Sequence, residues 1–231
     1  MADVLAHPWW AKPEAQFNPF WQSIHPVRQT YLFGPCTCDI DAKVVYLTVD
    51  QLKDIAKGAT FSNILKHVDP LNAAMHKYQI RTPLRIAHFI AQVAHESGRF
   101  IYTREIASGA AYEGRKDLGN TQKGDGKRFR GRGLIQITGR ANYTKYGTYV
   151  GKSFTDDTTA VQLEQEPWAS DSAGWFWHVY KKLSPLADAD NLLEITRRIN
   201  GGYNGLADRR SMLARAKAVL NIHQKVQEVG K

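Results

Sequence analysis

The stretch HFIAQVAHESG, residues 88–98, predicts an apolar helix that carries a carboxylate at its end. Most of its positions are apolar, so we expect the helix to be buried on most sides. A single polar stripe follows the 3.6-residue period and consists of His88, Gln92, His95, Glu96 and Arg99. Pro83 suits the first turn, and Gly98 suits a left-handed residue that ends the helix.

Glu96 is the residue of this helix with the clearest chemical meaning. Burying an unpaired charge is costly, so its carboxyl should be either paired with a cation or protonated. A protonated carboxyl at the mouth of a cleft can act as a general acid. The plainer alternative is a salt bridge to Arg99 or Arg104 at the helix end, and this segment alone leaves both open.

Composition narrows the classes of protein. The chain has 231 residues, enough for one good core with a small appendage. Its 43% hydrophobic and 11% aromatic content exclude a disordered chain. A formal net charge of +9 favours an anionic partner: nucleic acid, a membrane surface or an acidic polysaccharide. The chain has no recognised nucleic-acid-binding motif, so nucleic acid is not expected, and no apolar run is long enough to predict a membrane span.

The cysteines and the first residues bear on the compartment. Cys36 and Cys38 are separated by one residue, which strains a mutual disulfide and leaves a four-ligand zinc site incomplete. Synthesis in a reducing cytosol is therefore expected. The opening MADVLAHPWWAKPEAQ lacks the charged start and apolar stretch of a signal peptide. If the substrate lies outside the cytoplasm, other machinery must release or deliver the protein.

Two regions differ in pattern. Residues 1–45 are rich in Pro, Trp, Phe and His and predict an irregular aromatic arm, whereas residues 46–231 predict one catalytic domain. Thr48 and Gln51 form a capping box before a first helix. Further helical periods cover residues 62–78, 84–97, 168–182, 192–199 and 206–229.

The connections are also informative. Residues 108–132 are rich in Gly and charged residues and form a segment longer than a simple connecting loop needs. Long loops of this kind usually carry function. The segment GLIQITG, residues 133–139, indicates a strand or the buried start of a helix. Core positions are expected for His88, Trp175, Phe176, Trp177 and Tyr180. Together these patterns predict a mainly α, single domain whose long loops form a substrate cleft.

The sequence does not support three kinds of site: a zinc protease, a phosphate-binding loop and a cysteine nucleophile. A zinc protease needs a second His three residues after the Glu, but His95 and Glu96 are followed by Ser97, Gly98 and Arg99. No GxxxxGK[ST] phosphate loop occurs, and both cysteines lie in the arm, away from any catalytic group. We therefore expect neither a metal nor a cofactor.

The remaining candidates for catalytic residues are carboxylates. Glu105 and Glu113 follow Glu96 by nine and seventeen positions. Hydrolysis of a glycosidic bond needs one protonated and one ionised carboxyl on opposite faces of the sugar. The hydroxyl of Thr138 is a candidate for holding the attacking water, although it could equally be a plain strand residue. Sugar-binding side chains are also available, namely Tyr112, Gln136, Asn142, Tyr143, Asn200 and Tyr203.

Three segments resemble one family in the right order: AQVAHESGRF, GDGKRFRGRGLIQITGRANY and RRINGGYNGLADR. They are similar to glycoside hydrolase family 19, in its bacteriophage-endolysin branch rather than the plant chitinases, and the resemblance runs from Leu47 to Leu220. It implies a lysozyme-like α-helical domain and an inverting mechanism. Glu96 matches the family's general acid, Glu105 the second carboxylate, and Thr138 the hydroxyl that positions the water.

The same resemblance matches Gln136 and Asn142 to sugar-contacting amides, and Asn200 and Arg209 to late residues at the cleft floor. His95, Tyr112 and Glu113 complete the set of expected substrate-binding residues. The plant enzymes carry their base farther from the acid, on a stretch without a clear counterpart here, so Glu113 stays a rival to Glu105 for that role. The family's disulfides are also missing from this chain.

The sequence thus predicts a lysozyme-like glycosidase that cuts the β-1,4 glycan of bacterial peptidoglycan, as a phage endolysin or an injected antibacterial effector. We expect a monomer made in the bacterial cytoplasm that acts in the periplasm. Anionic outer-membrane lipid is a further expected contact, and an effector would add an immunity protein and delivery machinery. Chitinase activity and a non-catalytic wall-binding module are the alternatives. The basic side of the helix predicted from residue 206, with Arg210, Arg215, Lys217 and Lys225, either faces solvent or binds anionic wall.

Overall fold

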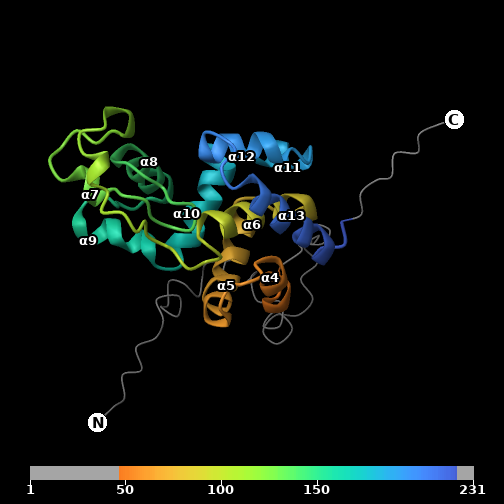
Figure 1. Ribbon diagram of the computed structural model, residues 1–231. Helices are drawn as coiled ribbons and strands as arrows, with labels where there is room; N and C mark the ends of the chain where they lie inside the picture. Colours follow the sequence, from red (N-terminus) through yellow and green to blue (C-terminus); the bar gives the residue numbers. More distant parts are fainter. Residues whose placement is uncertain (1–46, 223–231) are drawn as a thin grey trace, which may run out of the picture. The chain divides into compact units, whose positions relative to one another are not determined.

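The computed structural model describes residues 47–222. The arm predicted over residues 1–45, with Cys36 and Cys38, lies outside them. The described residues form helices joined by long loops and contain no extended strand, so the mainly α prediction is confirmed (Figure 1). The α-helices are α4 (Val49–Ile55), α5 (Phe61–Lys77), α6 (Pro83–Glu96), α7 (Asp125–Arg128), α8 (Arg140–Val150), α9 (Asp157–Ala160), α10 (Trp168–Trp175), α11 (Ser184–Asp188), α12 (Leu192–Asn200) and α13 (Leu206–Val219). Short 3-10 turns cover Ala110–Tyr112, Lys116–Leu118 and Val161–Glu164, and a π-helical turn, Phe176–Tyr180, continues α10.

Helix α6 is the centre of the domain. Thr82 caps its N-terminus, Pro83 occupies the first turn, and the apolar side chains from Ile86 to Ala94 are buried, as predicted. Burial of this many aliphatic and aromatic groups stabilises the domain by roughly 25 cal/mol for each Å² of apolar surface removed from water. Helices α12 and α13 supply the hydrogen-bond partners of Gln92, His95 and Glu96 in the polar stripe.

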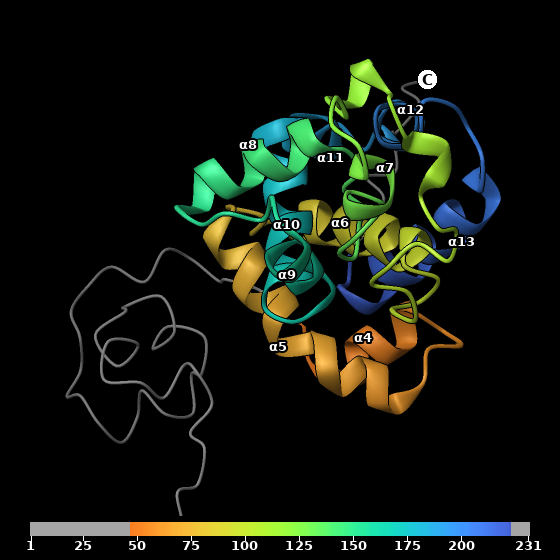
Figure 2. The ribbon, with the colours of Figure 1, turned by 90° about the vertical axis from the view of Figure 1, so that its left-hand side faces the viewer.

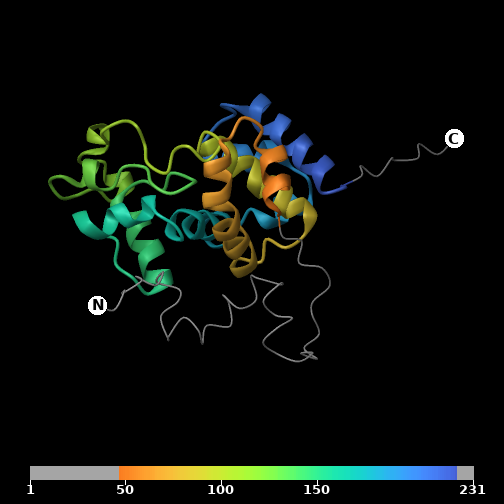
Figure 3. The ribbon, with the colours of Figure 1, turned by 90° about the horizontal axis from the view of Figure 1, so that it is seen from below.

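Two groups of helices lie on either side of α10. Helices α7, α8 and α9 form one group, and α4, α5, α6, α11, α12 and α13 form the other, as Figures 1 and 3 both show. Figure 2 looks onto the side that carries α7, α8 and α9. The loop that leaves α6 after Glu96 crosses from the second group to the first. This loop carries Glu105 and Glu113, so these two predicted site residues lie on the connection between the two helix groups.

Several local predictions hold. Thr48 and Gln51 form the reciprocal capping box of α4. His88 is fully buried, and its Nε2 lies 2.7 Å from Oδ1 of Asp190. Trp175 and Trp177 are core residues as predicted, whereas the core prediction is wrong for Tyr180, which is about one-third exposed and stacks on Trp175.

The segment at residues 133–139 is neither strand nor helix, so both predictions for it are wrong. It forms tight turns, because Gly133, Gln136 and Gly139 adopt left-handed or otherwise positive φ angles that neither element accommodates. Its only extended pairing among the described residues is a set of isolated bridges at Arg132, to Arg104 and to Ile137. Ile135 and Ile137 are buried without forming a strand.

The last helix is shorter than predicted. α13 ends at Val219 instead of residue 229, because Leu220 caps it and Asn221 turns left-handed. Its predicted basic side is partly used inside the domain. Arg215 donates to the carbonyl oxygen of Ile55, and Lys217 pairs with Asp190. Lys225 lies outside the described residues. Within residues 47–222, no helix combines the length and apolar character needed to span a membrane.

Candidate active site

Glu96 is the last residue of α6, and its side chain is 22% exposed. Its Oε1 accepts a hydrogen bond from Nη2 of Arg209 at 2.5 Å, so the cation predicted to pair with it is present. The plainer alternative is wrong about the partners: neither Arg99 nor Arg104 binds this carboxylate, because they pair with Asp208 and Glu164. The two side chains are in direct hydrogen-bond contact and largely shielded from water.

Arg209 is almost fully buried, and its guanidinium is shared among three acceptors. Besides Glu96 it donates to the side-chain oxygen of Gln92 and to the carbonyl oxygen of Asn204, the latter at 3.3 Å. Gln92 in turn donates to Thr196 at 3.3 Å. A buried guanidinium is tolerated only when its donors find partners, and this network provides them.

Asn200 joins the same network, because its amide donates to the Asn204 carbonyl at 3.1 Å. The sequence predicts Asn200 and Arg209 on the cleft floor, and the two residues share this acceptor. The structure thus brings Glu96, Arg209 and Asn200 together.

The residue before Glu96 forms a second pair with α13. Nδ1 of His95 lies 2.7 Å from Oδ2 of Asp208, while Oδ1 of Asp208 accepts from Nη2 of Arg99 at 2.8 Å. Arg99 also donates to the Lys57 carbonyl at 3.0 Å. Partial burial alone would raise the pKa of Asp208, but the hydrogen bond from His95 and the charge of Arg99 lower it overall. Asp208 is therefore held as a carboxylate.

Gly205 allows His95 to reach this position. It precedes α13 with φ +71°, and a Cβ placed on it would lie 2.2 Å from both Cε1 and Nε2 of His95. Any side chain here would displace the imidazole. Sequence reasoning missed Gly205 and Asp208, although both lie within the segment RRINGGYNGLADR that carries the resemblance.

Glu105 lies on the loop that crosses between the two helix groups. Its Oε1 accepts from the Tyr112 hydroxyl at 2.9 Å and its Oε2 from the amide of Gly131 at 3.1 Å. The backbone amide of Glu105 donates to the Gly131 carbonyl at 2.9 Å, so both the backbone and the side chain of Glu105 are hydrogen-bonded to Gly131. Burial, followed by the hydrogen bond to Glu105 and its charge, raises the pKa of Tyr112.

Gln136 lies near Glu105, with Gly131 between them. A Cβ placed on Gly131 would lie 2.8 Å from the side-chain oxygen of Gln136 and 3.3 Å from Cβ of Glu105, so Gly131 separates the two. The Thr138 hydroxyl donates to the Gln136 carbonyl at 3.0 Å, and the Asn142 amide donates to the Thr138 carbonyl at 2.8 Å. Hydrogen bonds thus join Gln136, Thr138 and Asn142 to one another.

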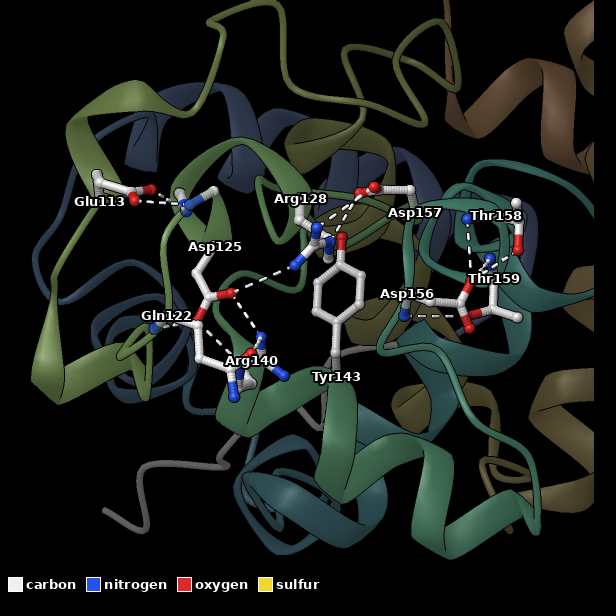
Figure 4. A network of polar contacts seen from close by, with 12 residues as sticks. Glu113, Gln122, Asp125, Arg128, Arg140, Tyr143, Asp156, Asp157, Thr158 and Thr159 are labelled. Atoms are coloured by element: carbon white, nitrogen blue, oxygen red, sulfur yellow. Dashed lines mark hydrogen bonds and ion pairs between the residues drawn. The ribbon is translucent and has the colours of Figure 1, made fainter.

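Glu113 has a different environment. Both of its oxygens accept backbone amides, from Gly124 at 2.7 Å and from Gly126 at 2.8 Å (Figure 4). These two hydrogen bonds lower its pKa. The amides precede and begin α7, so Glu113 anchors the loop to the start of that helix.

The anchored loop is held further by Asp125. This buried carboxylate accepts two hydrogen bonds from Arg140 at 2.6 and 2.8 Å and one from the Gln122 amide at 3.0 Å. Figure 4 shows Glu113 reaching the backbone beside Asp125, with Arg128 lying between Asp125 and Asp157. In residues 47–222 no group of three His, Cys, Asp or Glu side chains is arranged to hold a metal ion.

Comparison with known proteins identifies the family. No protein-family model matches the chain. A glycosyl hydrolase family 19 domain-containing protein of Haemophilus influenzae is 31% identical over 196 positions, which cover 69% of this chain and 94% of the relative. An endochitinase of Arabidopsis thaliana is 37% identical over 117 positions, covering 51% of this chain and 39% of the plant protein, so the chain spans about two-fifths of that relative.

Solved structures agree in fold. Chitinase C from Streptomyces griseus superposes with a TM-score of 0.61 at 19% identity, over 75% of this chain and 92% of that one. A bacterial family 19 chitinase gives a TM-score of 0.59 at 19% identity, over 76% and 95%. The fold is therefore the lysozyme-like α-helical fold of these enzymes. Together with the Haemophilus relative, which is matched over nearly its whole length, this shows that the chain is a glycoside hydrolase and belongs to glycosyl hydrolase family 19.

Proposed function

We propose that this enzyme hydrolyses the β-1,4 glycan strands of bacterial peptidoglycan, with Glu96 as general acid and Glu105 as general base. The observation that carries the assignment is the contrast between the two carboxylates. Glu96 is held by a buried guanidinium through one oxygen, and Glu105 is held by a phenol and one amide. An inverting glycosidase needs two separately held carboxyls, one donating and one accepting a proton, and the resemblance of the AQVAHESGRF segment to the family assigns the donor to Glu96.

The proposed reaction is a single displacement. Because Arg209 binds Oε1 of Glu96, Oε2 is the oxygen that carries the proton. That proton passes to the glycosidic oxygen as its bond to the anomeric carbon breaks. A water molecule attacks this carbon from the other face and gives its proton to Glu105, with Thr138 orienting the water. Arg209 stabilises the carboxylate that forms on Glu96, and proton exchange with solvent restores both groups.

Glu105 is preferred to Glu113 as the base on two grounds. Both oxygens of Glu113 are already engaged by backbone amides that anchor its loop. Glu105 lies across Gly131 from Gln136, which is predicted to bind sugar, and the Gln136 carbonyl accepts from Thr138, which is predicted to hold the water. Carboxyl groups roughly 6.5–9.5 Å apart leave room for a water in an inverting enzyme, and this separation stays a prediction for Glu96 and Glu105.

Charge and sequence resemblance favour peptidoglycan over chitin. The net charge of +9 suits an anionic wall, whereas chitin is uncharged. Chitin is the second candidate, because the plant relative is named an endochitinase and the similar structures are chitinases. Peptidoglycan as substrate puts the site of action in the periplasm, reached either as a phage endolysin or as a secreted effector.

The decisive experiment is mass spectrometry of the products released from purified peptidoglycan and from chitin hexamers by the same enzyme preparation. We expect muropeptides with one new reducing end, whose identity gives the bond cut, and little release from chitin. Faster turnover of chitin would replace the substrate assignment and leave the two carboxylates in place. Loss of activity on intact wall as salt rises from 50 to about 300 mM, without loss on short soluble glycans, would support a role for the basic surface, because the screening length shortens across this range.

A further inference from the structure

The carboxylate of Asp208 contacts the residues on both sides of Glu96 in the chain. Its Oδ2 binds His95, the residue before, and its Oδ1 binds Arg99, three residues after. The intervening turn is unusual, because Gly98, Arg99 and Phe100 all have positive φ angles between 57° and 66°. Consecutive left-handed residues are unfavourable unless their surroundings hold them, so this turn depends on such contacts.

Asp208 also lies next to the partner of Glu96 itself. His95 and Glu96 end α6, while Asp208 and Arg209 lie in the first turn of α13. The two adjacent residues of one helix thus bind the two adjacent residues of the other, His95 to Asp208 and Glu96 to Arg209. Since Asp208 and Arg209 belong to one rigid helical turn, the first contact determines where the guanidinium of Arg209 lies.

The ring edge of His95 packs against Gly205, and its Nδ1 is hydrogen-bonded to Asp208. The ring is therefore in contact with α13 and with the turn that precedes this helix. The sequence predicts that His95 binds substrate. Its contacts instead hold the end of α6 against the start of α13.

We propose that Asp208 is a positioning residue for the general acid: by binding His95 and Arg99 it fixes the turn around Glu96 and places Arg209 against the Glu96 carboxylate. The inference rests on the proposed role of Glu96. Asp208 itself does not touch the reacting atoms. Its effect should appear in the chemical step, because geometry errors of about 1 Å can lower a rate about 100-fold without changing substrate affinity.

The chain offers a matched control. Asp190 forms the same kind of bridge between α6 and α13, since it binds His88 and Lys217, but two helical turns away from Glu96. Asp208→Asn and Asp190→Asn each remove one charge from a His–Asp–cation bridge joining the same two helices. If the bridges serve only stability, both variants should lower the unfolding midpoint, and the two variants should have the same kcat.

The experiment measures kcat, KM and urea unfolding for Asp208→Asn, Asp190→Asn, Glu96→Gln and the double variant Glu96→Gln/Asp208→Asn on one soluble glycan. We expect Asp208→Asn to lower kcat by about 10- to 100-fold with KM within about twofold, and Asp190→Asn to keep the wild-type kcat. In the Glu96→Gln background, Asp208→Asn should cost little further activity, because both changes act through one carboxyl.

Three results would overturn the inference while leaving the proposed function intact. The first is a normal kcat in Asp208→Asn, and the second is an equal fall in kcat in both Asp→Asn variants. The third is additive losses in the double variant, which would refute action through Glu96. Full activity in Glu96→Gln would instead remove the proposed acid, and the inference with it.

Discussion

The guanidinium of Arg209 meets the carboxylate of Glu96 at 2.5 Å, across 113 positions of the chain. The contact is made to one oxygen only, which orients the carboxyl group and leaves its second oxygen for the proton. A cation here also favours the negative charge that develops as the proton leaves. The geometry therefore suits a group that must donate a proton in a defined direction.

Replacing Glu96 by Gln should lower the rate of glycan hydrolysis by about 10²- to 10⁴-fold, the usual contribution of general acid catalysis. The amide oxygen can still accept from Arg209, so the fold should persist. The measurement is turnover of a defined glycan, with circular dichroism and thermal unfolding as the check on folding. Retention of more than about a tenth of the wild-type rate would show that Glu96 is not the acid.

The two rival bases should respond differently to the same change. Glu105→Gln is expected to lower kcat by about 10²-fold or more with little effect on stability, because the amide oxygen can still accept one of the two hydrogen bonds. Glu113→Gln should retain most of the activity and lower the unfolding midpoint, because Glu113 accepts two backbone amides. Both variants are compared by kcat and by urea unfolding, and the opposite pattern would assign the base to Glu113.

Arg209→Met should destabilise the protein by about 3–5 kcal/mol, because it leaves partly buried Glu96 and buried Gln92 without their donor. Arg209→Lys keeps the charge but loses the planar fork that reaches three acceptors, so we expect a smaller loss of stability and a clear loss of kcat. Urea unfolding and steady-state kinetics on both variants provide the test. Equal stability of the two variants would mean that charge has no part in the network.

Gly205→Ala should lower both stability and kcat, since the new Cβ would overlap the His95 ring. Gly201→Ala is the matched control, because Gly201 is also left-handed at φ +76° but a Cβ there would have no neighbouring atom within 4 Å. The left-handed backbone alone costs about 1 kcal/mol, which both variants share. The excess loss in Gly205→Ala measures the contact with His95, and no excess would refute it.

Stability in acid should depend on Asp125. Hydrogen bonds from Arg140 are the main cause that lowers its pKa, against the opposing effect of burial. A carboxyl whose pKa is lower in the folded state stabilises the protein above its unfolded pKa of about 3.9, and this stabilisation is lost as the pH falls below that value. The free energy of unfolding of wild type and Asp125→Asn, measured from pH 6 to pH 2, should converge at the acid end. A constant difference across this range would contradict the assignment.

Local patterns in the sequence predict much of the helical structure. The stripe on α6 and the capping box at Thr48 are predictable because both depend on residues within a few turns of one another. The resemblance to the family identifies Glu96 and Arg209 separately but does not say that they bind each other. The neighbouring arginines are the natural candidates from sequence, and they prove wrong because tertiary packing brings α13 to the end of α6.

Loop paths are the least predictable part. Glu105 and Glu113 are alike in sequence, and their difference arises from which glycine amides each one meets, Gly131 in one case and Gly124 with Gly126 in the other. Those contacts depend on positive φ angles along the loop, which composition indicates but does not locate. The turns at residues 133–139 escape prediction for the same reason.

The distance along the chain between Glu96 and Arg209 also orders events during translation. A ribosome adding about 5–20 residues per second needs roughly 6 to 23 seconds to make the 113 residues that separate them. Throughout that interval the nascent polypeptide contains Glu96 but lacks the guanidinium that binds it. The Glu96–Arg209 pair therefore forms late in synthesis, when α13 emerges and closes onto a helix made long before.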